Sequence, residues 1–171
     1  KFLLHPLVHF SHAATITDAS SYDGNFVTTV KSEGRTKTIL HGVTILATGA
    51  DEYRPTEHLY GQDPRVLTQL ELEERLASGD LGGARAVAMI QCVGCRSDIH
   101  NYCARVCCSQ AVKNALRLKQ LRPDVDVYIL FRDMRTYGLK EDSYREAADK
   151  GVRFVRFEPA DGPEVEPAKD D

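Results

Sequence analysis

Five cysteines crowd into one short stretch of this 171-residue chain, and they are the residues best suited to chemistry. They stand at positions 92, 95, 103, 107 and 108. A disulfide framework normally spreads its cysteines so that distant segments are tied together, whereas this crowding brings sulfur ligands to one point. The odd number also prevents all five from pairing internally. The stretch therefore favours metal ligation or thiol redox chemistry.

An iron-sulfur cluster is one chemistry that this spacing allows. A cubane cluster needs four thiolates that converge from different directions. On a helix that begins at Cys103, Cys103 and Cys107 share one face about 6 Å apart, and Cys108 lies about 100° round from Cys107. Cys92 comes from the end of the preceding strand. These four thiolates can supply the ligands of a [4Fe-4S] cluster.

Three other interpretations of the cysteines stay open on the residues alone. Four sulfurs would satisfy a zinc ion in a structural or interaction module, although the adjacent Cys107 and Cys108 strain a single tetrahedron. Cys92 and Cys95 have the spacing of a thiol-disulfide oxidoreductase, but three crowded cysteines would then be unexplained. The third alternative is a set of buried, inert thiols.

The elements around the cysteines indicate an α/β fold with a Rossmann-like domain over residues 61–158. A capping box of Thr68 and Glu71 predicts a helix through Ser78. Strands and helices then alternate in a βαβαβ order, which predicts a parallel, right-handed sheet. The expected ranges are strands at 86–91, 125–131 and 152–157, and helices at 103–121 and 141–150. The turn after the first strand carries Gly94 but no G-x-G-x-x-G, so a nicotinamide there is disfavoured.

Residues 1–60 have a different pattern and are expected to form the C-terminal part of an FAD-binding half-domain. Short strands at 13–17, 26–30 and 37–40, separated by tight turns, predict a β-meander. An apolar run at 43–47 predicts a strand buried on both faces, which ends at Thr48-Gly49-Ala50. We expect a domain boundary near residue 60, and an acidic tail at 159–171 that is disordered or truncated.

Composition restricts the partners. The chain has 22 Lys plus Arg against 25 Asp plus Glu, a formal net charge of -3. This balance gives no electrostatic reason to expect nucleic acid or an anionic membrane. The sequence shows neither a membrane span nor an export signal, so we expect a cytoplasmic protein. Because its first residue is not Met, we also expect a piece of a larger protein.

Four segments together resemble one known family. They are residues 66–73 (VLTQLELE), 90–94 (IQCVG), 102–108 (YCARVCC) and 127–138 (VYILFRDMRTYG). From about residue 24 to 157 the chain resembles the heterodisulfide reductase A subunits and their bacterial relatives. In that family, the thiolates that match Cys92, Cys103, Cys107 and Cys108 hold a [4Fe-4S] cluster. Cys95 departs from the family pattern, in which Ser or another residue usually follows the glycine.

The resemblance also implies a flavin. The central part of the family resembles thioredoxin reductase, in which a second domain interrupts an FAD-binding domain. Residues 47–50 look like the segment that closes the FAD domain and passes close to the flavin, which implies contacts by Thr48, Gly49 and Ala50. Ala14 and Ile16 resemble the strand beside the adenine end.

The function implied by the resemblance is electron transfer in an oxidoreductase component that is inactive alone. Electrons would pass between FAD and the [4Fe-4S] cluster, as in flavin-based electron bifurcation. The implied partners are other heterodisulfide-reductase-like subunits and ferredoxin, or a hydrogenase or dehydrogenase as electron donor.

Overall fold

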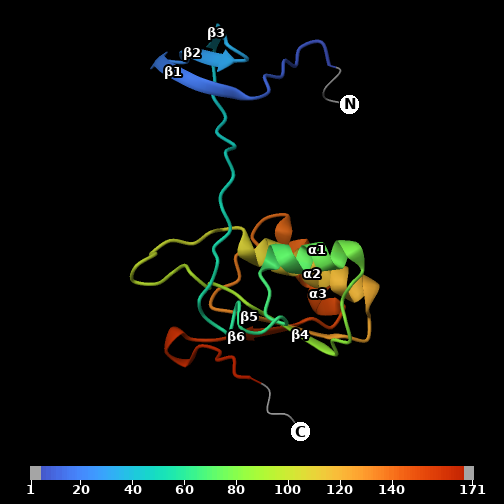
Figure 1. The fold of residues 1–171 in the computed structure, drawn as a ribbon. Helices are drawn as coiled ribbons and strands as arrows, with labels where there is room; N and C mark the ends of the chain where they lie inside the picture. Colours follow the sequence, from blue (N-terminus) through green and yellow to red (C-terminus); the bar gives the residue numbers. More distant parts are fainter. Residues whose placement is uncertain (1–4, 168–171) are drawn as a thin grey trace. The chain divides into compact units, whose positions relative to one another are not determined.

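The computed structural model describes residues 5–167, which divide into two compact units between Asp51 and Glu52 (Figure 1). The division falls earlier than the boundary expected near residue 60, because residues 52–60 are bonded to the second unit. Glu52 accepts hydrogen bonds from the Thr68 hydroxyl and the Leu70 amide, and Tyr60 donates one to Glu71.

The first unit contains an antiparallel meander in the order β1-β2-β3, as the sequence predicts. The strands are β1 (Ala14–Tyr22), β2 (Asn25–Ser32) and β3 (Arg35–His41). Both hairpins have two-residue turns with positive φ at each central position, 35° and 78° at Asp23-Gly24 and 49° and 77° at Glu33-Gly34. Such turns match the right-handed twist of the flanking strands, so they fix the register.

The strand expected at residues 43–47 is not formed. Residues 43–50 have no regular secondary structure, and Val43, Ile45 and Leu46 are 74%, 85% and 81% exposed. The prediction rested on hydrophobicity alone. A buried strand also needs neighbours for its backbone hydrogen bonds, and β1–β3 pair only with one another within residues 5–167.

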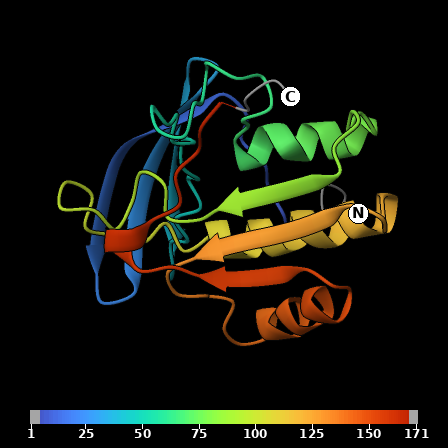
Figure 2. The ribbon, with the colours of Figure 1, turned by 90° about the horizontal axis from the view of Figure 1, so that it is seen from below.

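The second unit contains the predicted parallel sheet, in the order β4-β5-β6. Its strands are β4 (Ala86–Ile90), β5 (Asp126–Phe131) and β6 (Arg153–Arg156). Figure 2 shows their arrowheads pointing the same way, so their carboxyl ends meet at one edge of the sheet. The loop that carries the cysteines leaves β4 from this edge.

Three helices cover one face of this sheet in both views (Figures 1 and 2). They are α1 (Gln69–Ser78), α2 (Cys107–Leu121) and α3 (Lys140–Asp149). The predicted capping box at α1 is confirmed, since the Thr68 side chain accepts from the Glu71 amide and the Glu71 carboxylate accepts from the Thr68 amide. α2 begins at Cys107 instead of Cys103, because Arg105 has a left-handed φ of 59° that interrupts a helix.

The hydrophobic core lies between α2 and the sheet. Strand positions alternate, so Val127 and Ile129 are fully buried on the helix side. They pack in one cluster with Val112, Leu118 and other apolar side chains. Asn114 is also buried on α2, where its amide donates to the backbone and side-chain oxygens of Gln69 on α1. This bond fixes α1 against α2.

The chain after β6 forms the short 3-10 helix η2 (Pro159–Asp161) and then has no regular structure through residue 167. The last four residues of the expected acidic tail lie outside the described part. Among the described residues, no helix combines the length and hydrophobicity needed to cross a membrane.

Candidate functional site

The five cysteines lie at the carboxyl edge of the parallel sheet, on a loop and a helix start. Cys92, Cys95 and Cys103 lie in the loop that joins β4 to α2, whereas Cys107 and Cys108 open α2. Cys95 and Cys108 are buried and the other three are half-buried. All five are free thiols. Because Cys103 precedes the helix, the expectation that Cys103 and Cys107 share one helical face is wrong.

Four of the thiols interact electrostatically with one another. Cys92 interacts with Cys95 and Cys108, and Cys107 interacts with Cys92, Cys95 and Cys108. A hydrogen bond between the adjacent thiols raises the pKa of Cys107 and lowers that of Cys108 to about 6. Burial raises the pKa of Cys92. The sulfur of Cys103 instead accepts a hydrogen bond of 3.3 Å from the Arg105 amide.

Arg96 and Asp133 attach the cysteine loop to the end of β5. The Arg96 guanidinium lies 2.5 Å from the Asp133 carboxylate and 3.9 Å from the Cys92 sulfur. Arg132 donates to the Arg96 carbonyl oxygen at 2.7 Å. On the other side, the Asp133 carbonyl oxygen lies 3.9 Å from the Cys108 sulfur. Asp133 therefore contacts both the loop and the start of α2.

We expect the unfolding free energy of the Asp133→Asn variant to change less with pH in the acid range than that of wild type. The hydrogen bond from Arg96 holds the pKa of Asp133 below its ordinary value of 3.8. A carboxylate with a lowered pKa stabilises the fold above its ordinary pKa, and this contribution is lost as the pH falls through the lowered value. The variant should be less stable than wild type at pH 7, and the difference should disappear in strong acid. Urea unfolding followed by helical circular dichroism checks this.

The matched control for that experiment is Asp80→Asn, at an exposed turn after α1. It should leave stability unchanged across the same pH range. A wild-type advantage over Asp133→Asn that persists undiminished in strong acid would contradict the role given to the Arg96–Asp133 pair.

Gly94 lies under the ring of Tyr53, and this contact shapes the turn that bears Cys92 and Cys95. The Cys95 amide donates to the Cys92 carbonyl oxygen at 3.4 Å across the turn. Gly94 has a φ of 69°, and a Cβ at this position would overlap three atoms of the Tyr53 ring. Neither the backbone conformation nor the space allows a side chain here.

We therefore expect Gly94→Ala to destabilise the second unit by two separable causes. The left-handed backbone alone costs about 1–2 kcal/mol for a residue with a Cβ, and the overlap with Tyr53 adds to this. Combining Gly94→Ala with Tyr53→Ala should relieve the overlap and restore that part of the unfolding free energy. The loss caused by the left-handed backbone should remain. Unfolding free energies of the two single variants and the double variant measure both causes. Strict additivity of the two substitutions would show that the ring is not the obstacle.

Buried polar atoms without partners gather around the cysteines. Within residues 5–167, four side-chain atoms have this status, namely Gln91 Nε2, Gln91 Oε1, Ser109 Oγ and Arg132 Nε. Gln91 directly follows β4, Ser109 lies in the first turn of α2, and Arg132 directly follows β5. Buried polar groups are normally paired, so a concentration at one edge indicates a place for a further group.

The donor set fits an iron-sulfur cluster in its chemistry. Thiolates are the ligands that hold such clusters, and thiols placed at the end of a strand and the start of a helix approach from different directions. Among the described residues, however, no three cysteine, histidine, aspartate or glutamate side chains are already arranged to bind a single metal ion. Cysteines bind a metal as thiolates, so metal binding releases the proton of each thiol that is still protonated.

The residues expected to contact a flavin lie in or next to the meander. Ala14 and Ile16 are on β1, whereas Thr48, Gly49 and Ala50 are in the irregular stretch after β3. All five are exposed. A flavin held by these residues alone would therefore stay largely in contact with water.

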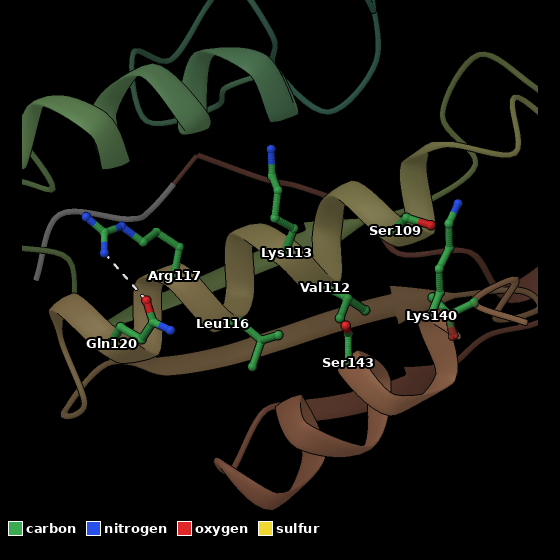
Figure 3. Close-up of a pocket in the computed structure, with 9 residues that line it drawn as sticks. Ser109, Val112, Lys113, Leu116, Arg117, Gln120, Lys140 and Ser143 are labelled. Carbon is green, nitrogen blue, oxygen red and sulfur yellow. Dashed lines mark hydrogen bonds between the residues drawn. The ribbon is translucent and has the colours of Figure 1, made fainter. Parts of the chain in front are cut away.

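A groove of about 330 Å³ lies between α2 and α3, apart from the thiols (Figure 3). Val112, Leu116 and Ser143 face one another across it, whereas Lys113 extends toward α1. The Lys113 ammonium is paired there with Glu73 at 2.5 Å. The groove shares Ser109 with the surroundings of the cysteines but is lined by no thiol.

The comparison with curated proteins finds relatives that are named as A subunits of heterodisulfide reductases. Over 138 residues the chain is 39% identical to the A subunit of H(2):CoB-CoM heterodisulfide,ferredoxin reductase from Methanothermobacter thermautotrophicus, covering 70% of this chain and 21% of that protein. It is 39% identical over 137 residues, with the same shares, to the iron-sulfur A subunit of CoB-CoM heterodisulfide reductase from Methanocaldococcus jannaschii. It is 38% identical over 132 residues to the A subunit of the ferredoxin/F(420)H(2)-dependent CoB-CoM heterodisulfide reductase from Methanosarcina acetivorans. This match covers 67% of this chain and 17% of that protein. No protein-family model matches the chain.

These relatives are all named as subunits of reductases, which are oxidoreductases. Over about 70% of its length, the chain is similar to the heterodisulfide reductase A subunits. It spans about a fifth of the length of the curated relatives that it matches.

Proposed function

We propose that this chain is an electron-transfer segment whose Cys92, Cys103, Cys107 and Cys108 hold a [4Fe-4S] cluster. The single observation that carries the proposal is the concentration of free thiols and unpartnered buried polar atoms at one edge of the parallel sheet. The name of the Methanocaldococcus relative, which calls it an iron-sulfur subunit, supports the same chemistry.

Two residues compete for the fourth ligand position. Cys95 interacts with Cys92 and Cys107, whereas Cys103 lies further along the same loop. We assign the position to Cys103 because the family resemblance places a ligand there. Its sulfur is bonded only to a backbone amide of its own loop in the contacts described, so the loop can carry it toward Cys107 without breaking a side-chain pair. Cys95 then remains a buried, unligated thiol.

The proposed function extends to FAD, contacted by Ala14, Ile16, Thr48, Gly49 and Ala50. When bound, a flavin carries two electrons and a cluster carries one, so the two together convert pair transfer into single transfer. This chain's own residues would orient the thiolates and limit water around them. Arg96, beside Cys92, would offset the negative charge of the site.

The proposal also extends to a longer protein of the length of the curated relatives, of which this chain would form one segment. Its role would be flavin-based electron bifurcation in the cytoplasm. Its partners would be other heterodisulfide-reductase-like subunits with ferredoxin, or a hydrogenase or dehydrogenase as electron donor. The names of the relatives, which mention H(2), ferredoxin and F(420)H(2), support this choice.

Anaerobic reconstitution tests the proposal. The chain is incubated with ferrous iron and sulfide, desalted, and analysed for iron, acid-labile sulfide and zinc. We expect about four irons and four sulfides per chain with broad visible absorption. A colourless protein that retains one zinc would instead support a zinc-stabilised interaction module. Flavin fluorescence after incubation with FAD tests the flavin separately.

A second candidate function is thiol-disulfide exchange by Cys92 and Cys95. The observation that favours it is the hydrogen bond that closes the turn between them, which keeps the two residues in one tight turn. Exchange activity depends on such paired thiols. An insulin-reduction assay that loses its signal in Cys95→Ser would support this candidate, whereas the cluster proposal predicts no such activity.

A further inference from the structure

Gln91 is a buried amide with no partner, directly before the first cysteine. Its side chain belongs to a residue that is 3% exposed, and neither Nε2 nor Oε1 has a hydrogen-bond partner. An unpaired buried amide costs about 1–3 kcal/mol. The Gln91 backbone amide is bonded to the Leu130 carbonyl oxygen at 2.9 Å, which continues the β4-β5 ladder. The backbone is thus satisfied, and only the side chain lacks partners.

The strand geometry places this side chain on the helix-covered face of the sheet. Residues two apart on a strand share a face, so Gln91 follows Met89, which is buried in the core. α2 packs on this face, because Met89 shares the core cluster with Ala111 and Val112, and the first turn of α2 contains Cys107, Cys108 and Ser109. The buried amide of Gln91 therefore lies on the face of the sheet that α2 covers, and Gln91 is the chain neighbour of Cys92.

The chemistry of the surroundings decides what the amide can bind. An amide nitrogen donates two hydrogen bonds, and thiolates and inorganic sulfides accept them. We propose that Gln91 is a positioning residue whose Nε2 donates a hydrogen bond to a sulfur of the bound cluster, which stabilises its reduced, more negative state. This inference rests on the proposed function, because it needs a cluster in the site.

The decisive test is Gln91→Leu, because the inference predicts opposite effects with and without the cluster. In the cofactor-free chain the substitution removes an unpaired amide, so the unfolding midpoint in urea should stay the same or rise. In the reconstituted chain it removes a hydrogen bond to sulfur, so the reduction potential should become more negative. The cluster should also be lost faster in air, because removing a partner around a metal site weakens metal binding by about tenfold or more.

Asn114→Leu provides the matched control. Asn114 is also a buried amide, but it has partners on Gln69. Its replacement should lower the unfolding midpoint and leave the reduction potential of the reconstituted chain unchanged. Gln91→Glu, which keeps the size but replaces the donor amide by an acceptor carboxyl, should shift the potential in the same direction as Gln91→Leu.

The outcomes separate this inference from the proposed function. If wild-type chain takes up neither iron nor sulfide, the proposed function is wrong and the inference falls with it. If wild type takes up the cluster but Gln91→Leu leaves its potential and lifetime unchanged, only the inference is wrong. A Gln91→Leu variant that is clearly less stable without the cofactor also contradicts it, because the amide would then have partners in the empty site.

Discussion

Replacing Cys107 with serine is expected to abolish the retention of iron and sulfide by the reconstituted chain. Cys107 opens α2 and interacts with three other thiols, so its sulfur lies among the proposed ligands. A serine hydroxyl is not deprotonated near neutral pH and is a poor ligand for a cluster that is held by thiolates. Iron and acid-labile sulfide, measured after anaerobic desalting, should fall to background.

Cys95→Ser is the matched control for Cys107→Ser, because it makes the same replacement of sulfur by oxygen at another of the five clustered cysteines. It should retain iron and sulfide at the wild-type level. Both variants should unfold in urea within about 1 kcal/mol of wild type without cofactor, so that loss of iron cannot be attributed to loss of the fold. Full retention by Cys107→Ser, or loss in Cys95→Ser only, would overturn the assignment of ligands.

Leu118→Ala should cause a large loss of stability in the second unit. Leu118 on α2 is 0% exposed and packs in the core cluster with Val127 and Ile129. Removing most of a buried leucine side chain costs about 2–5 kcal/mol, because both the transfer energy and the contacts around the cavity are lost. Within residues 5–167 all three α-helices belong to the second unit, so helical circular dichroism in urea reports its unfolding.

Leu139→Ala makes the same chemical change at a position that is 90% exposed. It should change the unfolding free energy by less than about 0.5 kcal/mol. Equal losses for the two leucine variants would mean that the core does not lie between α2 and the sheet.

The local patterns of the second unit were sufficient to predict its fold. The βαβαβ order, the parallel sheet and the capping box of Thr68 and Glu71 are confirmed, because hydrophobic period and helix caps are properties of neighbouring residues. In the first unit the turns at Gly24 and Gly34 are confirmed for the same reason. The family resemblance from short motifs is confirmed by the relatives.

The features that sequence reasoning missed depend on contacts between distant residues. A run such as 43–47 can be apolar without neighbours to pair with, and hydrophobicity does not reveal their absence. The pair of Arg96 and Asp133 joins residues 37 positions apart, and no local pattern marks it. Gln91 gave one usable signal, a polar residue at an inward-facing strand position. The late start of α2 depends on the backbone conformation of Arg105, which composition does not specify.

The irregular stretch at residues 43–50 has a practical consequence for handling the protein. The stretch is exposed and contains no helix or strand, and proteases cleave backbone of this kind preferentially. Brief digestion with an enzyme that cleaves after aliphatic side chains should release a fragment that keeps every cysteine and the helices α1, α2 and α3. Such a fragment would permit spectroscopy of the sulfur site without interference from the meander.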